Sequence, residues 1–204
     1  MLKNVLIAIT AGLLLLGCSG EEDKGKSEAQ DESSQPIVFI ETELGTIKLE
    51  LWPDVAPNHV ANFLDLVNSG FYTGLTWHRV IKGFVIQSGD PNADGSGNAG
   101  YVIPEEFSGL PHNPGTLSMA RGHEYNSASC QFFICLARRP DLDGQYTIFG
   151  RTIEGLDVVK KIGKTKTDKK EKPLEDIHVL KIWQEGKEPV EAPSDREKAV
   201  DLGN

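Results

Sequence analysis

Between residues 37 and 185 the chain alternates short apolar runs with turn residues, and this pattern limits its fold more than any other feature. In the run TIKLEL at 46–51, apolar and charged residues alternate, which is typical of a strand that buries one face. The run IVFIET at 37–42 precedes it across a short turn at 43–45, so the two runs predict a β-hairpin. Further strand-like runs are WHRVI (77–81), FVIQSG (84–89), GTLSMA (115–120), QFFICLA (131–137), YTIFGRT (146–152) and IHVLKIW (177–183).

Only two segments of this region have the 3.6-residue period of an amphipathic helix. Residues 56–69 place apolar side chains at i, i+3, i+4 and i+7, with Pro57 near the expected start and Gly70 after the end. Residues 156–162 form a second, shorter stripe. Seven or eight strands with two helices predict a mainly β domain, a closed antiparallel sheet capped by helices, because closure removes exposed edges. A β-sandwich is the alternative.

Residues 1–17 have the features of a secretory signal. Lys3 is their only charge, and the apolar run at 5–16 is too short to span a bilayer comfortably. The run ends in Leu16-Gly17-Cys18, which resembles the lipobox of bacterial lipoproteins, in which the cysteine is lipidated and becomes the mature N-terminus. We therefore expect a protein anchored to a membrane of the bacterial cell envelope by lipid on Cys18. An ordinary cleaved signal with an incidental cysteine is the alternative.

Polar segments flank the predicted domain on both sides. Residues 18–36 contain no aromatic or branched aliphatic residue after Cys18, so they are expected to form a disordered acidic tether. Residues 186–204 are expected to form a flexible polar tail. Ser19, where Asp would suggest retention in the inner membrane of a Gram-negative cell, favours the outer membrane, facing the periplasm.

The charge and the positions of the cysteines lead to two further predictions. The net charge is -9, and the only lysine-rich stretch, at 164–172, is interpreted as a solvated turn, so no nucleic-acid partner is expected. In an exported protein, a pair such as Cys130 and Cys135 could form a disulfide. They lie in a strand-like run, however, with side chains expected on opposite faces, so we predict two free, buried thiols.

The run WHRVIKGFVIQSGD at 77–90 resembles the signature of the cyclophilin-type peptidyl-prolyl cis/trans isomerases. The resemblance continues in the same order through GTLSMA, SCQFFI and LDGQYTIFGRTIEGLDVV, and it covers nearly all of residues 37–185. It implies a closed eight-stranded antiparallel β-barrel with a helix over each end and a substrate groove on the outside. It also implies that the protein accelerates rotation of X-Pro bonds in unfolded or flexible segments of exported or envelope proteins and so assists their folding.

This reaction needs no nucleophile, metal or cofactor. The barrier of about 18–20 kcal/mol comes from amide conjugation, and a donor aimed at the prolyl nitrogen stabilises the twisted amide. Arg79 matches the family's catalytic arginine, and a guanidinium stays charged at any relevant pH. The resemblance assigns the remaining substrate-binding positions to His78, Phe84, Val85, Gln87, Ala120, Arg121, Gln131, Phe133, Leu142 and Tyr146.

Strand alternation divides these residues between two faces. Gln131 and Phe133 share one face, whereas Phe132 and Ile134 are expected to point into the barrel. One departure from the family concerns Asp141, which stands where eukaryotic members that bind cyclosporin tightly have Trp. The absence of Trp at this position removes an apolar contact and a ring N–H donor, so we expect weak binding of cyclosporin.

Other arrangements are possible on paper. His123 with Ser127 or Ser129 and an Asp would form a nucleophile, and His112 with His123 and a Glu would form a metal site, but neither has the spacing of a known motif. A non-catalytic chaperone or adaptor that holds proline-containing segments in the same groove is the serious competitor. We expect a monomer.

Overall fold

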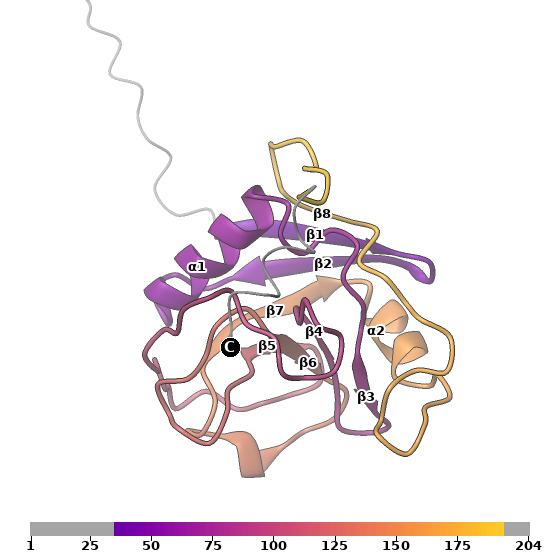
Figure 1. Ribbon diagram of the computed structural model, residues 1–204. Helices are drawn as coiled ribbons and strands as arrows, with labels where there is room; N and C mark the ends of the chain where they lie inside the picture. The colour runs from indigo at the N-terminus through magenta and orange to yellow at the C-terminus, as the bar shows by residue number, and fades with distance from the viewer. Residues whose placement is uncertain (1–34, 194–204) are drawn as a thin grey trace, which may run out of the picture. The chain divides into compact units, whose positions relative to one another are not determined.

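The structure, a computed structural model, describes residues 35–193 and contains eight strands, two α-helices and one 3-10 helix (Figure 1). Their order is β1 (Ile37–Thr42), β2 (Gly45–Leu51), α1 (Pro57–Asn68), β3 (Arg79–Ile81), β4 (Val85–Ser88), β5 (Thr116–Met119), β6 (Phe132–Cys135), the 3-10 helix η1 (Pro140–Leu142), β7 (Ile148–Glu154), α2 (Leu156–Ile162) and β8 (Lys181–Gln184). Every strand-like run and both helices predicted from the sequence are confirmed. The 3-10 helix was not predicted.

Several predictions concern residues outside the described range. The signal at 1–17, Cys18 with nearly all of the tether, and the tail from 194 onward belong to this group. Residues 186–193, the start of the predicted tail, contain no helix or strand, and the Val190 carbonyl accepts a hydrogen bond of 2.8 Å from the Thr73 hydroxyl. Within residues 35–193, no helix is long and apolar enough to cross a membrane.

The eight strands form one antiparallel sheet in the order β3-β4-β6-β5-β7-β2-β1-β8. The prediction of a closed barrel is wrong, because β3 and β8 are the two ends of a curled, open half-barrel. The segments before these two strands approach each other, but they share only the isolated bridge between Thr76 and His178 and a few neighbouring backbone hydrogen bonds. The physical reason is that the outer edge of β3 is bonded to another segment, since Val80 N donates to the Glu171 carbonyl at 2.8 Å, so β3 and β8 form no ladder with each other.

Local sequence signals explain the ends of both helices. Pro57 occupies the first turn of α1, where its missing N–H costs nothing, and Gly70 follows the helix with a left-handed φ of 75°. Gly155 precedes α2 with a φ of 80°, and a Cβ there would lie 2.3 Å from the Thr46 carbonyl oxygen. A glycine is therefore required where the chain passes from β7 into α2.

The main core lies between the concave side of the sheet and the helices. Helix α1 packs on β7 and β8, and α2 packs on β2, and the two helices lie at opposite ends of the curled sheet in Figure 1. Phe132 is the centre of an aromatic cluster, with edge-on contacts to Phe63, Tyr72 and Trp77 at centroid distances of 5.3, 5.4 and 5.7 Å. This packing leaves the outer face of β4 and β6 to a separate, smaller cluster.

Candidate functional site

The smaller cluster is a patch of apolar side chains on the outer side of β4 and β6. Val85, Phe133, Cys135 and Leu142 are its buried members, and Phe84, Ala120 and Tyr146 pack against them. Strand alternation had predicted this division, because Phe132 and Ile134 belong to the main core instead. The patch thus brings together all six apolar or aromatic positions that the resemblance had assigned to substrate binding from Phe84 onward. Cys135 is an additional member of the cluster. The sequence predicted that its thiol is buried, but not that it belongs to this patch.

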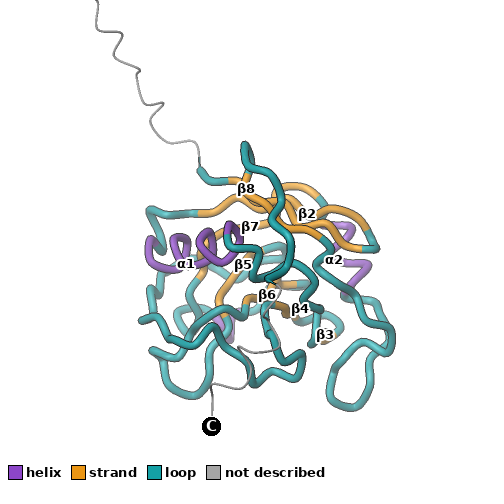
Figure 2. The backbone as a smooth tube through the Cα atoms, turned by 45° about the horizontal axis from the view of Figure 1, so that its top comes forward, coloured by secondary structure: helices purple, strands orange, loops and turns teal. Residues whose placement is uncertain are grey.

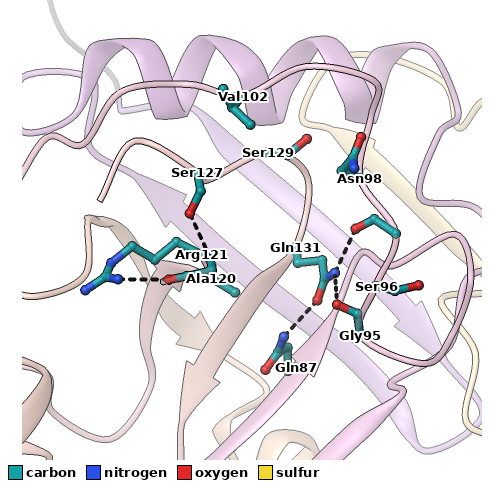
Figure 3. Close-up of a pocket in the computed structure, with 12 residues that line it drawn as sticks. Gln87, Gly95, Ser96, Asn98, Val102, Ala120, Arg121, Ser127, Ser129 and Gln131 are labelled. Carbon is teal, nitrogen blue, oxygen red and sulfur yellow. Dashed lines mark hydrogen bonds between the residues drawn. The ribbon is translucent and has the colours of Figure 1, made fainter. Parts of the chain in front are cut away.

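A chain of polar side chains runs along one edge of this apolar cluster. The register of β3 and β4 places Arg79 opposite Gln87, and an Arg79 Nη donates to Gln87 Oε1 at 3.2 Å. Gln87 Nε2 donates to Gln131 Oε1 at 2.9 Å, as Figure 3 shows. Gln131 Nε2 in turn donates to the carbonyls of Gly95 and Gly97 at 3.0 and 2.8 Å. The network orients both amides and fixes one edge of the Arg79 guanidinium, whose side chain is 39% exposed.

The other edge of Arg79 is held by a residue that the sequence reasoning had missed. Arg79 Nε donates to Glu171 Oε2 at 2.8 Å. Glu171 comes from the lysine-rich stretch at 164–172, which had been interpreted as a solvated turn. Most of its lysines are indeed exposed, whereas Glu171 is half-buried against the arginine. Nothing in the local pattern of the stretch distinguished this carboxylate from its neighbours.

A cavity of about 370 Å³ lies beside the apolar cluster (Figure 3). The cluster and the cavity share Ala120, and the polar chain contributes Gln87 and Gln131 to the lining. The other lining residues are Gly95, Ser96, Gly97, Asn98, Val102, Arg121, Gly122, Ser127 and Ser129. The lining is mostly uncharged and polar, so the cavity can accept a small polar group with hydrogen bonds from several sides.

Arg121 forms one end of this cavity. Its guanidinium stacks over the rings of Tyr125 and Tyr146, with the guanidinium carbon 4.6 and 4.8 Å from the ring centroids. Its Nε also donates to the Gln145 carbonyl at 3.1 Å, and in Figure 3 the guanidinium points away from Gln131. Arg121 is therefore tied to the aromatic wall that includes Tyr146.

The loop at 90–100 owes its shape to Asp90, a second residue that the sequence reasoning had not singled out. The carboxylate is fully buried and accepts hydrogen bonds from the backbone N–H groups of Asn92, Asp94, Gly95 and Gly97. An Asp that begins such a Gly-rich segment is the local signal for a turn bonded to its side chain. Asp90 thereby presents the two glycine carbonyls to Gln131.

Two histidines of this region, His78 and His112, are buried. His78, predicted to be on the groove side, is 4% exposed, and neither ring nitrogen has a hydrogen-bond partner. Burial lowers the pKa of His78, although nearby Asp90 opposes the shift. His112 stacks on Phe133 at 6.1 Å, and burial lowers its pKa against the opposing effect of Asp143.

His112 also completes an arrangement of Ser, His and Asp that the sequence reasoning had not considered. Its Nε2 lies 3.1 Å from Ser118 Oγ, and its Nδ1 lies 3.1 Å from Asp143 Oδ1. Ser118 is fully buried, however, and its hydroxyl donates to the Thr147 carbonyl at 2.9 Å. A substrate cannot reach this hydroxyl, so the group supports the floor beneath Phe133 rather than forming a nucleophile.

Within residues 35–193, the structure does not support the nucleophile with Ser127 or Ser129, or the metal site, that the sequence analysis weighed as alternatives. Ser127 Oγ donates to the Glu124 carbonyl and accepts from Gly122 N, and Ser129 Oγ accepts from Ala99 N. No group of three or more His, Cys, Asp or Glu side chains in this range could hold a metal ion. The prediction of two free, buried thiols is confirmed, and burial raises the pKa of both to about 12.

Comparison with known proteins assigns the chain to a class. A family model of the cyclophilin type peptidyl-prolyl cis-trans isomerases matches residues 37–184. The chain belongs to this family, and it is an enzyme that isomerises X-Pro peptide bonds.

Individual relatives agree with this assignment. A peptidyl-prolyl cis-trans isomerase of Synechococcus elongatus is 50% identical over 126 residues, which are 61% of this chain and 86% of that protein. Human peptidyl-prolyl cis-trans isomerase-like 1 is 36% identical over 162 residues, or 76% of this chain and 96% of that protein. A crystal structure of a cyclophilin type isomerase from Cryptosporidium parvum has a TM-score of 0.72 at 34% identity and covers 76% of this chain and 100% of that chain.

A second Cryptosporidium parvum structure was determined in the presence of the dipeptide Ala-Pro. It has a TM-score of 0.69 at 36% identity and covers 72% of this chain and 96% of that chain.

Proposed function

We propose that the apolar cluster holds the proline ring of the substrate and that Arg79 stabilises the twisted amide. The apolar cluster is the feature that supports this most, because Phe133 and Leu142 are buried side by side with Val85 at the edge where Arg79 lies. The Ala-Pro dipeptide in the Cryptosporidium parvum structure supports a proline-containing ligand for this fold.

The chemistry follows from the geometry of Arg79. Rotation about an X-Pro bond takes roughly 10–100 s without catalysis, and milliseconds require about 5–7 kcal/mol of transition-state stabilisation. Two of the five N–H donors of Arg79 are engaged by Glu171 and Gln87, so three remain for the substrate. As the amide twists, the lone pair localises on the prolyl nitrogen, and these donors interact with charge that the planar ground state lacks.

Substitution of Arg79 tests this role. Arg79→Ala and Arg79→Lys should lower kcat/KM by at least about a hundredfold, because an ammonium cannot reproduce a planar fork held at two edges. Arg151→Lys is the matched control, since Arg151 pairs with Glu50 on another part of the sheet. Turnover is measured on a short proline peptide, together with urea unfolding to show that each variant is folded. Near wild-type turnover in Arg79→Lys would contradict the proposed role.

We further propose that the enzyme acts on exported or envelope proteins while anchored by lipid at Cys18, and that it faces the periplasm from the outer membrane in a Gram-negative cell. The support is the apolar run at 5–16 followed by Gly17-Cys18, and the polar segment up to residue 36 that would separate lipid from domain. The client segments would be unfolded or flexible stretches that contain proline. Because Arg79, the apolar cluster and the cavity all lie within one chain, we propose that the protein acts as a monomer.

Fractionation of cells that express full-length Cys18→Ser tests the anchor. The variant should leave the membrane fraction, and labelling with a radioactive fatty acid should disappear, whereas the wild type keeps both. A Cys18→Ser protein that stays membrane-bound after its signal has been cleaved would contradict lipid anchoring. The proposed monomer is tested separately by sedimentation of a protein that begins after Cys18.

A further inference from the structure

We infer that Glu171 is a positioning residue, which holds the Arg79 guanidinium in the orientation that the substrate requires. The inference rests on the role proposed above for Arg79. Its first support is the contact between Glu171 Oε2 and Arg79 Nε at 2.8 Å, since both side chains are only about two-fifths exposed, at 43% and 39%. A charge-assisted bond of this length is shorter and stronger than one between neutral groups.

The main chain of Glu171 is also attached to β3. The Glu171 carbonyl accepts a hydrogen bond of 2.8 Å from Val80 N, the residue next to Arg79. The carboxylate and the carbonyl of one residue therefore hold two consecutive residues of an edge strand. This double attachment fixes where the carboxylate lies along β3, so the contact with Arg79 does not depend on a freely moving loop.

The loop that carries Glu171 is organised internally by Asp168. Asp168 Oδ1 accepts hydrogen bonds from Lys170 N and Lys172 N at 2.7 and 3.0 Å, and Asp168 N donates to the Lys172 carbonyl at 2.8 Å. Thr167 and Pro173 form a bridge that closes the base of the loop. Because its ends are joined and its turn is bonded to one side chain, the loop presents Glu171 in a single place.

The backbone of Glu171 has a conformation that does not favour glutamate. Its φ is 68°, and the only other non-glycine residue with a positive φ in residues 35–193 is Ala93, at 55°. Glycine adopts this conformation without strain, whereas a side chain with a Cβ does not. A loop that only had to turn here would be better served by glycine. Strained residues of this kind concentrate at functional sites. Here the contact of the carboxylate with Arg79 explains why the position carries a glutamate rather than a glycine.

The consequence concerns the plane of the guanidinium. Gln87 accepts from one Nη of Arg79, and Glu171 accepts from Nε. Two contacts on different nitrogens fix the direction of a planar group, whereas one contact leaves it free to rotate about that bond. Without Glu171, Arg79 keeps its charge and its bond to Gln87, but its remaining donors no longer point in one direction. Misplacement of a catalytic group by about 1 Å can cost up to a hundredfold in rate.

Glu171→Gly separates positioning from loop structure, because glycine removes the carboxylate and relieves the backbone strain at the same time. We expect kcat to fall about tenfold with KM changed less than about twofold, while the urea midpoint stays the same or rises. Glu171→Gln keeps an acceptor oxygen without the charge and should recover part of the loss. Ala93→Gly, the matched strain-relieving change, and Glu175→Gln, an exposed carboxylate of the following segment, should leave turnover unchanged.

A second readout follows Arg79 itself. In the wild type, the Arg79 Nε–H resonance in a nitrogen-15 spectrum should exchange slowly with water, and Glu171→Gly should make that exchange at least about tenfold faster. The inference is overturned if Glu171→Gly keeps kcat within twofold of the wild type, or if exchange at Nε is unchanged. These results are distinguishable from failure of the proposed function, which would show as near wild-type turnover in Arg79→Ala.

Discussion

Adjacent phenylalanines of β6 should respond to truncation in opposite ways, because they belong to different clusters. Phe132 is fully buried in the main core, with three edge-on aromatic contacts. Phe133 is 4% exposed and packs on Tyr146 at 5.6 Å and on His112 at 6.1 Å, next to the proposed substrate site. We predict that Phe132→Ala mainly lowers the free energy of unfolding, whereas Phe133→Ala mainly lowers turnover.

The magnitudes follow from where each void would open. Truncation of Phe132 leaves an enclosed cavity among Phe63, Tyr72 and Trp77, so the cost is about 3–5 kcal/mol. Truncation of Phe133 opens a void at the protein surface, which water or a ligand can enter, so the transfer contribution of about 1.5–3 kcal/mol dominates. From the middle of the two ranges, Phe133→Ala should therefore be about 2 kcal/mol more stable than Phe132→Ala. Its kcat/KM should nevertheless fall at least about tenfold, because the floor of the pocket is gone.

Urea unfolding followed by circular dichroism gives the stabilities, and isomerisation of a short proline peptide at low temperature gives kcat/KM. If Phe132→Ala is unfolded, the pair Phe132→Leu and Phe133→Leu repeats the comparison with a smaller change in volume. The reasoning is refuted if the variant at Phe133 is the less stable of the two, or if it isomerises the peptide as fast as the wild type.

Three other predictions concern stability and drug binding. Burial lowers the pKa of His59, His78 and His112, so between pH 6.5 and 5 the unfolded chain binds more protons than the folded one. The free energy of unfolding should therefore fall as the pH falls through this range, by up to about 1.4 kcal/mol per pH unit for each histidine. Urea midpoints at several pH values measure this fall. Gly155→Ala should cost more than Gly186→Ala in the same assay, since both have a φ of 80° but a Cβ meets the Thr46 carbonyl only at Gly155. Asp141→Trp, which breaks the pair with Arg139, should strengthen cyclosporin inhibition about tenfold in a titration at nearly constant peptide turnover; unchanged inhibition would mean that Asp141 does not border the groove.

Periodic patterns in the sequence were sufficient to predict the strands, both helices and the division of β6 between two faces. The apolar positions alternate wherever one face is buried, so the outward direction of Phe133 and the inward direction of Phe132 follow from their order. The members of the proposed proline pocket were instead assigned by the resemblance to the cyclophilin family, because only Val85 and Phe133 among the assigned apolar positions lie in strands.

Contacts between distant segments could not be predicted in this way. Glu171 meets Arg79 across 92 positions of the chain, and no periodicity connects them. The open seam between β3 and β8 likewise depends on where irregular backbone replaces a ladder, which strand propensity does not report. Asp90 could be predicted in part. Its place before a glycine-rich loop is a local signal in the sequence, but the hydrogen bonds that it accepts from Asn92 N and Gly97 N depend on the folded loop.

Every residue of β4, β5 and β6 is buried, because these strands have the main core on one face and the proposed site or covering loops on the other. Figure 2 shows how much of the chain around β3, β4 and β6 consists of loop. A substitution in these strands therefore alters either the core or the site, and little neutral variation is open to them. Loops tolerate change more readily, so the evolution of new peptide preferences has its freest route through Ser96, Asn98 and Arg121 on the cavity wall. Laboratory selection for altered preference should begin with libraries at these three positions.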